Sequence, residues 1–506
     1  MIKFYSINDT GNEGIVSEIQ AHLSAGLPTI QLIGSVGKSL DESKERIRSA
    51  FSSCNIEMPR KKITINISPS DIAKNGAHYD LGIALSILAE SNRIKTKSLD
   101  NKTILLGELS LDGVVKPVRG ILGKIQTAKK AGFSNFIIPA ENMPQAQLIP
   151  NINLCGVSSL GQLERALQTA GLEFVDTQEG GPIDFSTSTP DIDIADVIGQ
   201  AAAKRALKIA AAGQHNILLS GPPGVGKSML AKSMIGILPT LTREEIITIT
   251  HLHSLVGSQT ALLKTTRPMR SPHHSSSDVA IIGGGQNPKP GEITLSHLGI
   301  LFLDELPEFK RSTIESLRQP LEDKKVTVSR AKETATYPAD FVLVATKNPC
   351  PCGYYGSTKP CTCSPIEIDR YQKKLSGPLL DRIDLHVTVD SIDHRKLLAD
   401  HKPDPKENSK NTQKQVIDVI NKQRARFGST SARNGSMNNK EIRKHANMTD
   451  EAKELLDNAA RKLDISARVY MKTVKLARTI ADLDGSDNIL PAHIGEALRY
   501  RPAKTA

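Results

Sequence analysis

A glycine-rich loop between an apolar strand and a helix is the feature that most constrains this chain. The apolar residues 217–219 lead into the segment Gly221-Pro-Pro-Gly-Val-Gly-Lys227-Ser228, and helix-forming residues follow directly. In this context backbone N–H groups surround the phosphates of a nucleotide, the lysine reaches the β- and γ-phosphates, and the serine hydroxyl binds Mg²⁺. The sequence therefore predicts a nucleotide site formed by Gly221, Pro222, Pro223, Gly224, Val225, Gly226, Lys227 and Ser228.

Two more apolar strands are predicted to end in polar side chains at one edge of a parallel sheet. Residues 299–303 lead to Asp304 and Glu305, and residues 341–345 lead to Asn348. Ligands of open α/β sheets bind at the carboxyl ends of the strands. We expect Asp304 to hold Mg²⁺, Glu305 to polarise the attacking water, and Asn348 to orient that water against the γ-phosphate. Taken singly, the acidic pair would also fit a solvated strand end, and the asparagine a turn before a proline.

Two arginines are candidates for contact with the γ-phosphate. Arg382 lies in the segment 376–384, and Arg468 lies in Ser466-Ala-Arg-Val. Phosphoryl transfer gains from an arginine that reaches the γ-phosphate, and a neighbouring subunit often supplies it. Composition alone does not distinguish these two arginines from the others in the chain.

The length of 506 residues predicts about three domains, each able to bury its own core. Alternating strand-like and helical patterns over residues 1–175 indicate an α/β domain, and the Gly-, Pro- and Ser/Thr-rich stretch 176–191 indicates a linker. Residues 192–400 have the spacing of a parallel sheet with helices on both faces, and residues 401–506 have helical patterns only. The fold class is therefore α/β, with a small helical C-terminal domain.

Composition excludes several classes of protein. Hydrophobic residues make up 39% and charged residues 24% of the chain, which is ordinary for a globular protein. No apolar run approaches the roughly 20 residues of a membrane helix, and the first 14 residues lack the pattern of a secretory signal. We expect a cytoplasmic protein with no membrane partner.

Positive charge is concentrated in the last hundred residues. The net charge is +11, and residues 401–506 alone carry 21 basic and 13 acidic side chains. A basic excess in one segment suggests a polyanionic partner. A solvated and highly charged helical surface would give the same count, so both interpretations stay open.

Four of the six cysteines fall within fourteen positions. The pairs Cys350-Pro-Cys352 and Cys361-Thr-Cys363 are separated by eight residues that include two glycines and a proline. In a reducing compartment such a cluster suggests a metal before disulfides, and tetrahedral Zn²⁺ takes four thiolates. The C-x-C spacing departs from the usual C-x-x-C pairs, so reduced structural thiols remain the alternative.

Longer strings of residues resemble the ComM/YifB family of magnesium-chelatase-like AAA+ ATPases almost from end to end. They are Arg267-Pro-Met-Arg-Ser-Pro-His-His274, Gly283-Gly-Gly285, Pro290-Gly-Glu-Ile, Leu301-Phe-Leu-Asp-Glu-Leu-Pro-Glu-Phe309, Leu317-Arg-Gln-Pro-Leu-Glu322, Asn348-Pro-Cys-Pro-Cys-Gly353 and Ala477-Arg-Thr-Ile-Ala-Asp-Leu483. The resemblance implies an N-terminal Lon-protease-like domain of ribosomal S5-like α/β fold. It also implies a central AAA+ module with a doubly wound parallel sheet and a small all-helical lid.

The resemblance also implies roles for single residues. It places Asn348 at the sensor-1 position, Arg382 at the arginine-finger position and Arg468 at the sensor-2 position. Members of this clade work as rings, usually hexamers, that bind ATP between subunits. Two insertions face the central channel, a helix-2 insert near 267–285 and a hairpin over 324–337. Their basic residues can hold DNA phosphates without reading sequence, although ordinary charged turns would also fit: Arg267, Arg270, Lys324, Lys325, Arg330 and Lys332.

The N-terminal domain resembles the Lon protease catalytic domain but lacks its reactive pair. Asp80 stands near the serine position and Leu122 near the lysine position, with Lys124 two residues beyond. Without a nucleophile and a base, peptide hydrolysis is not expected. We expect this domain to act as a scaffold that helps to assemble the ring or to guide DNA.

Together the resemblance implies an ATP-driven ring motor on single-stranded and branched DNA. Such a motor would promote branch migration during natural transformation, with recombination proteins as candidate partners and with ATP, Mg²⁺ and Zn²⁺ as cofactors. Two alternatives stay open. One is a chelatase-type motor that remodels a protein partner, and the other is a scaffold that holds ATP as a structural ligand.

Overall fold

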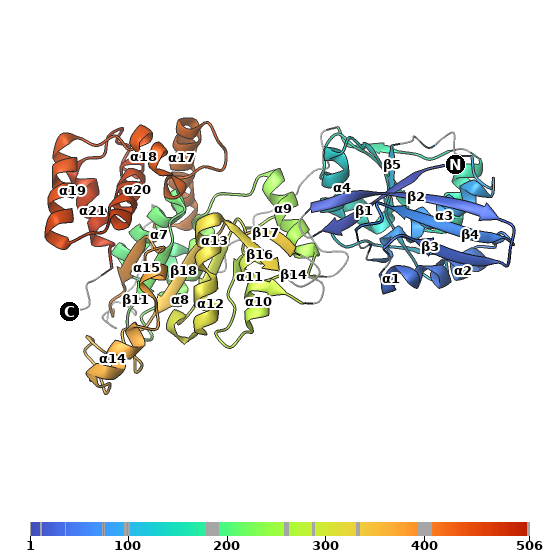
Figure 1. Cartoon of the computed structure of the whole chain (residues 1–506). Coiled ribbons are helices and arrows are strands. Elements are labelled where there is room, and N and C mark those ends of the chain that lie inside the picture. Colours follow the sequence, from blue (N-terminus) through green and yellow to red (C-terminus); the bar gives the residue numbers. More distant parts are fainter. Residues whose placement is uncertain are drawn as a thin grey trace. The chain divides into compact units, whose positions relative to one another are not determined.

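The computed structural model describes most of the chain, which forms two compact units. The described residues are 2–10, 13–35, 37–72, 74, 76–95, 99, 102–169, 171–178, 192–257, 263–285, 289–329, 334–391 and 407–502. The first unit consists of Met1–Ser186, Thr242–Thr265 and Ser329–Thr336, and the second of Thr187–Leu241, Thr266–Val328 and Tyr337–Ala506. Figure 1 shows the elements of each unit.

The first unit is built on a mixed eight-stranded sheet with the order β10-β9-β8-β5-β1-β2-β4-β3. Strand β2 pairs antiparallel with β1 and β4, whereas β5, β8 and β9 run parallel to one another. The strands are β1 (Phe4–Thr10), β2 (Glu13–Ser24), β3 (Thr29–Ile33), β4 (Lys62–Ser68), β5 (Thr103–Leu105), β8 (Asn135–Pro139), β9 (Asn153–Val157) and β10 (Val175–Asp176), and β6 (Glu108–Leu109) pairs separately with β7 (Val115–Lys116).

Alternation along the strands directs apolar side chains to one face of this sheet. In β4 the side chains of Ile63, Ile65 and Ile67 are buried and the intervening ones are not, as expected for a strand with one packed face. These residues form one core with buried side chains of α2 and α3. The helices of this part of the unit are α1 (Lys38–Asp41), α2 (Ser43–Ser53), α3 (Asp80–Glu90), α4 (Ile121–Lys130), α5 (Met143–Ala146) and α6 (Leu160–Gln168).

A second core in the first unit includes a helix from much later in the sequence. Leu122 and Ile125 of α4 pack in it, together with Ile247 of α9 (Arg243–Ser254). The two helices approach closely at Gly123, where a Cβ would lie 2.2 Å from the Cε1 atom of His251. Only a residue without a side chain fits at this position, so α9 is seated in the N-terminal core.

The second unit is built on a five-stranded sheet with the order β12-β15-β18-β11-β19, in which every pair is parallel. The strands are β11 (Ile217–Ser220), β12 (Met269–Arg270), β15 (Ile300–Leu303), β18 (Val342–Lys347) and β19 (Leu385–Thr388). All four residues of β15 are buried, as are the first five of β18, as expected for a parallel sheet covered on both faces. The predicted doubly wound parallel sheet is confirmed.

Helices and a short hairpin complete the second unit. One face of the sheet, which includes Ile217 and Leu219, packs with α7, α8 and α17 in one core. The helices are α7 (Ala201–Gly213), α8 (Lys227–Ser233), α10 (Asp278–Ile282), α11 (Glu292–Leu295), α12 (Arg311–Ser316), α13 (Arg318–Asp323), α14 (Pro365–Gln372) and α15 (Gly377–Leu380). The hairpin pairs β13 (Gly283–Gly284) with β14 (Lys289–Pro290). A further pair of strands, β16 (Lys325–Ser329) and β17 (Thr334–Pro338), is divided between the two units, because Ser329–Thr336 belongs to the first.

The described residues from 407 onward form helices without strands, as the helical patterns predict. They are α17 (Ser409–Phe427), α18 (Asn439–His445), α19 (Asp450–Leu463), α20 (Ala467–Leu483) and α21 (Pro491–Arg499). Side chains at the N-caps, such as Thr449 and Ser466, accept hydrogen bonds from the first turn, which stabilises a helix start. Several of these helices share the core of the sheet. Among the helices that the structure describes, none combines the length and apolar character that crossing a membrane requires.

Candidate nucleotide site

The glycine-rich loop connects β11 to α8, and its conformation depends on two glycines. Gly224 and Gly226 have φ angles of +80° and +87°, in the left-handed region that residues with a Cβ rarely adopt. The loop turns Lys227 inward, and its Nζ donates hydrogen bonds to the carbonyl oxygens of Gly221 and Pro222, each at 2.7 Å. The ammonium group is thus held within the loop, where phosphate groups bind in this motif.

Thr346 at the end of β18 holds both acidic residues that follow β15. Its Oγ1 donates to Oδ1 of Asp304 at 2.5 Å and accepts from the backbone N–H of Glu305 at 2.8 Å. Ser228 Oγ donates to the other oxygen of Asp304 at 3.0 Å. The hydroxyl of Ser228 and the carboxylate of Asp304 are the hard oxygen ligands that Mg²⁺ prefers, so this pair fits the ion.

Asn348 connects the lysine of the loop to the second acidic residue. Its Oδ1 accepts a hydrogen bond from Lys227 Nζ at 3.0 Å, and its Nδ2 donates to Glu305 Oε1 at 3.4 Å. Burial lowers the pKa of Lys227, and the charges of Asp304 and Glu305 oppose this effect. The structure therefore brings together five of the predicted site residues: Lys227, Ser228, Asp304, Glu305 and Asn348.

Sequence reasoning missed Thr346. The available signal was one polar residue that follows four apolar positions of β18, and it was visible only as a break in an otherwise apolar strand. Its role depends on the parallel register that sets Leu303 opposite Ala345. That register places the residue after β15 beside Thr346.

The two predicted arginines meet at the other end of the sheet. Arg382 forms an ion pair with Glu322, and Arg468 Nη2 lies 3.8 Å from the same carboxylate. Asn216, the residue before β11, donates its Nδ2 to the carbonyl oxygen of Arg382 at 3.0 Å. Because β11 has four residues, roughly 13 Å of strand separates this end from the glycine-rich loop. The structure does not bring either arginine to Lys227 within one chain.

Comparison with known proteins decides the family. The chain matches the family models for magnesium chelatase subunit ChlI over residues 193–397, for subunit ChlI of Mg-chelatase over residues 19–142, and for the ChlI C-terminal region over residues 406–501. It is 39% identical to Competence protein ComM of Haemophilus influenzae over 508 residues, which cover 98% of this chain and 96% of that protein. The chain belongs to the ComM/YifB family of magnesium-chelatase-like AAA+ proteins.

Two further relatives agree with this family. The chain is 40% identical to the uncharacterized protein YifB of Salmonella typhimurium over 489 residues, which cover 96% of this chain and 93% of that protein. It is also 29% identical to Lon protease 2 of Bacillus subtilis over 147 residues, which cover 26% of each chain. Both findings fit the predicted combination of a chelatase-like module with a Lon-like region.

In this ComM/YifB family member the four clustered cysteines lie together after Asn348. Their Sγ atoms all lie within 4.8 Å of one another, and Cys350 Sγ is 3.4 Å from Cys352 Sγ and 3.7 Å from Cys361 Sγ. Four thiolates at about 2.3 Å from a tetrahedral Zn²⁺ would be separated by about 3.8 Å. The backbone N–H groups of Tyr354 and Thr362 lower the pKa of Cys352, whereas burial and the neighbouring thiols Cys352 and Cys350 raise the pKa of Cys361 and of Cys363, as expected for thiols that crowd one site without a cation between them. The donor set therefore fits Zn²⁺.

The cysteine segment also contacts the glycine-rich loop. Gly353 has a φ of +85°, and a Cβ on it would lie 2.7 Å from Pro223 Cδ and 3.9 Å from Asn348 Cγ. The backbone of the segment thus packs directly on the loop and on the asparagine. A change in the conformation of the cysteine segment would therefore affect the positions of Pro223 and Asn348 at the nucleotide site.

The basic residues that the family resemblance assigned to DNA differ in their surroundings. Arg267 donates at 2.6 Å to the carbonyl oxygens of Pro239 and Leu298. Arg270 forms a bidentate ion pair with Glu292, with N···O distances of 2.5 and 2.6 Å, and Lys324 Nζ lies 3.0 Å from an Asp340 oxygen. Lys325 is exposed at the start of β16. Arg330 and Lys332 lie outside the described residues.

At the Lon-like position of the first unit an ion pair stands instead of a nucleophile. Arg46 Nε donates to Asp80 Oδ2 at 2.7 Å, and the N–H of Leu109 donates to the same oxygen at 3.2 Å. Burial raises the pKa of Asp80, and its bonds to Arg46 oppose that effect. Leu122 and Lys124 are both buried. These contacts indicate a structural role for Asp80. Its side chain has no hydroxyl that could act as the nucleophile of a protease.

Proposed function

We propose that this chain hydrolyses ATP with Mg²⁺ as a homo-oligomeric ring, most simply a hexamer, that moves DNA. The observation that carries the proposal is the separation of the catalytic groups along β11. The phosphate-binding and water-activating groups lie after the strand, whereas Arg382 is fixed beside the residue that precedes it. A second copy that presents its Arg382 to this edge would complete the site, as arginine fingers do in related enzymes.

The proposed reaction uses the chain's own groups in fixed roles. Lys227 exchanges its carbonyl partners for the β- and γ-phosphates, and Ser228 and Asp304 hold Mg²⁺, which neutralises developing negative charge. Glu305 accepts a proton from the attacking water, and Asn348 orients that water. Because Asn348 bonds both Lys227 and Glu305, a shift of the lysine toward a phosphate would release the amide and with it the carboxylate. Arg382 and Arg468 act on the nucleotide of the adjacent copy.

DNA as the substrate rests on three supports. One relative at 39% identity is named a competence protein, and the last hundred residues hold most of the net positive charge. Lys325 is exposed at the start of β16, and Arg330 and Lys332 follow within seven positions in the sequence. Contacts to phosphates by such side chains are independent of sequence. We assign DNA contact first to Lys325, Arg330 and Lys332. Arg267, Arg270 and Lys324, which already bond protein groups, we assign to the support of the two insertions.

We further propose that the motor promotes branch migration of recombination intermediates in the cytoplasm during natural transformation, with recombination proteins as partners. Zn²⁺ bound by Cys350, Cys352, Cys361 and Cys363 would fix the segment that packs on Pro223 and Asn348. In this proposal residues 1–175, 192–400 and 401–506 act as scaffold, motor module and lid.

A branch-migration assay tests the proposal most simply. Purified protein is given a labelled four-way junction with and without ATP, and a Glu305→Gln variant serves as the inactive control. Conversion of the junction into its duplex products supports the DNA motor if it requires both ATP and Glu305. ATP turnover that responds only to a protein partner would instead favour the remodelling alternative, and turnover near zero under every condition would favour the scaffold.

A further inference from the structure

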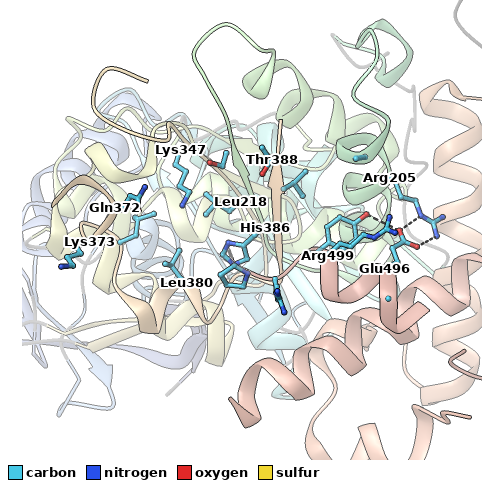
Figure 2. A pocket seen from close by; sticks show the side chains of 18 of the residues that line it. Arg205, Leu218, Lys347, Gln372, Lys373, Leu380, His386, Thr388, Glu496 and Arg499 are labelled. Atoms are coloured by element: carbon cyan, nitrogen blue, oxygen red, sulfur yellow. Dashed lines mark hydrogen bonds and ion pairs between the residues drawn. The ribbon is translucent and has the colours of Figure 1, made fainter. Parts of the chain in front are cut away.

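A cavity of about 1100 Å³ in the second unit lies beside the strand end that precedes the glycine-rich loop. It is lined by parts of α7, β11, β18, β19, α14, α15 and α21, and no residue of 221–228 is among them. Leu218 and His386 line it from β11 and β19 (Figure 2). They alternate with Ile217 and Leu385, which face the main core. The cavity therefore extends over the other face of the sheet and, around the edge strand β19, to Val387 and α7.

The lining is positively charged, and three of its cations have no carboxylate partner. Arg205 pairs with Glu496, and Lys373 with Asp369. Within the part of the chain that the structure describes, no ion pair involves the remaining cations, Lys347, Arg499 and Arg501. Together these three side chains give the cavity a net charge of about +3, and a positively charged concave surface concentrates anions.

Lys347 is the most informative of these cations. It is the last residue of β18 and is half-buried, and burial alone lowers the pKa of its side chain. An ammonium group that has lost water without gaining a carboxylate is costly. An anion that enters the cavity would remove this cost. Figure 2 shows Lys347 at the same wall as Leu218.

The remaining wall is suited to an uncharged group. Leu218 and Leu380 supply apolar surface, and His386 has an Nε2 atom that is buried without a hydrogen-bond partner among the described residues. Burial, followed by the charges of Lys472 and Lys347, lowers the pKa of His386 to about 4. The ring is therefore neutral at pH 7 and offers a nitrogen for hydrogen bonding rather than a charge.

We propose that this cavity binds a small phosphorylated molecule of nucleotide size. Its phosphate groups would contact Lys347, Arg499 and Arg501, and its uncharged part would lie against Leu218, Leu380 and His386. The volume matches that of pockets that enclose ligands of this size, which combine mostly apolar walls with a few polar anchors. A small ligand fits better than a nucleic-acid strand because the cations line a single cavity rather than an extended groove.

The position of Lys347 gives such a ligand access to the catalytic edge. Lys347 stands between Thr346, which bonds Asp304, and Asn348, which bonds Lys227 and Glu305. A phosphate that binds Lys347 and shifts its position would also shift the end of β18, and with it Thr346 and Asn348. The binding itself does not require that the chain hydrolyse ATP, so its test is independent of the proposed function.

Calorimetric titration with inorganic pyrophosphate tests the proposal. The protein carries Lys227→Ala, so that the glycine-rich loop loses its phosphate-binding lysine and the cavity is measured alone. We expect saturable binding whose Kd rises about tenfold when Lys347→Met is added, since a charge-assisted contact is lost. Lys373→Met is the matched control, because that lysine lines the same cavity but already pairs with Asp369, and its Kd should stay within about twofold. No saturable binding, or equal Kd values with and without Lys347→Met, would overturn the proposal.

Two further measurements cover a folding defect and the size of the ligand. If Lys347→Met does not fold, Arg499→Gln at the exposed end of α21 should raise the Kd in the same direction, and an unchanged Kd would count against the site. AMP should bind more tightly than inorganic phosphate if the uncharged wall contributes. A single-stranded oligonucleotide that binds in place of pyrophosphate, with an affinity that depends on Lys347, would assign the cavity to nucleic acid and overturn the small-molecule proposal.

Discussion

Arg382 forms an ion pair with Glu322 at the end of β11 that lies away from the glycine-rich loop. The same carboxylate lies 3.8 Å from Arg468, so one acidic side chain holds both arginines at one edge. The hydrogen bond from Arg382 lowers the pKa of Glu322, which keeps this carboxylate ionised. In the proposed ring, an arginine held in this way would act on the nucleotide of another copy of the chain and not on its own.

The carboxylate of Glu305 is expected to be needed for hydrolysis and not for binding. Glu305→Gln should keep ATP affinity but lower turnover by at least roughly 100-fold, because the amide cannot accept a proton from water. Fluorescent-nucleotide titration and phosphate release measure the two effects, and light scattering should show an assembled ring that persists with ATP. The neighbouring Glu308, which pairs with Lys374, provides the control Glu308→Gln, whose turnover should be unchanged. Equal losses in both variants would contradict the assigned role.

Thr346 is expected to matter for both stability and turnover. Thr346→Val removes the acceptor of the Glu305 N–H and one of the two donors to Asp304. The loss of these part-buried hydrogen bonds should cost about 1–3 kcal/mol in the free energy of unfolding. Turnover should fall together with Mg²⁺ affinity, because Asp304 loses its orientation. Thr346→Ser restores the hydroxyl and should recover both. Chemical denaturation and Mg²⁺-dependent kinetics provide the readouts, and a serine variant as defective as valine would argue against the hydrogen bonds.

The cysteine cluster is expected to carry about one Zn²⁺ per chain. Elemental analysis of protein prepared without chelator measures the metal directly. Cys352→Ser should remove the metal and lower ATP turnover, since the segment that packs on Pro223 would lose its anchor. Cys54, a free cysteine outside the cluster, supplies the control Cys54→Ser, which should keep both. Wild-type protein that contains no metal would contradict this prediction and would indicate that the four cysteines are reduced structural thiols.

His386 is expected to make the folded state sensitive to mild acid. Its pKa is lowered to about 4 by burial and by the charges of Lys472 and Lys347, so the unfolded chain binds the extra proton between pH 4 and its ordinary pKa near 6.5. The free energy of unfolding should therefore fall as the pH drops through this window, by at most about 3 kcal/mol from this residue. His386→Asn should flatten the fall, whereas His273→Asn, at an exposed position, should not. Parallel pH profiles for all three proteins would contradict this expectation.

Much of the fold follows from local pattern. The isoleucines of β4 alternate, β15 is apolar throughout, and the last helices have capping residues, so a single sequence predicts these elements. The glycine-rich loop and the acidic pair after β15 are likewise contiguous motifs. Their chemistry is encoded in neighbouring positions, and the structure brings Lys227, Asp304 and Glu305 within one network.

The features that could not be predicted from the sequence depend on contacts between residues that are far apart in the chain. An amphipathic pattern predicts α9 as a helix but does not tell that Ile247 packs with the N-terminal core. Glu322 and Arg382 are 60 positions apart, and nothing in either segment indicates their pairing. The basic segment at Arg270 suggested DNA contact, yet its charge meets Glu292, which lies 22 positions later. Such pairings arise only when strands are placed in register.

Complementation between two inactive variants tests most directly whether neighbouring copies complete the nucleotide site. Arg382→Ala alone should bind ATP yet lose at least roughly 1,000-fold in turnover, as expected for loss of an arginine finger, and Lys227→Ala alone should fail to bind. Mixed before assembly, they should regain ATP hydrolysis, because an intact glycine-rich loop of one copy then meets an intact Arg382 of the other. A mixture that assembles but stays inactive, or an Arg382→Ala protein with normal turnover, would contradict the account.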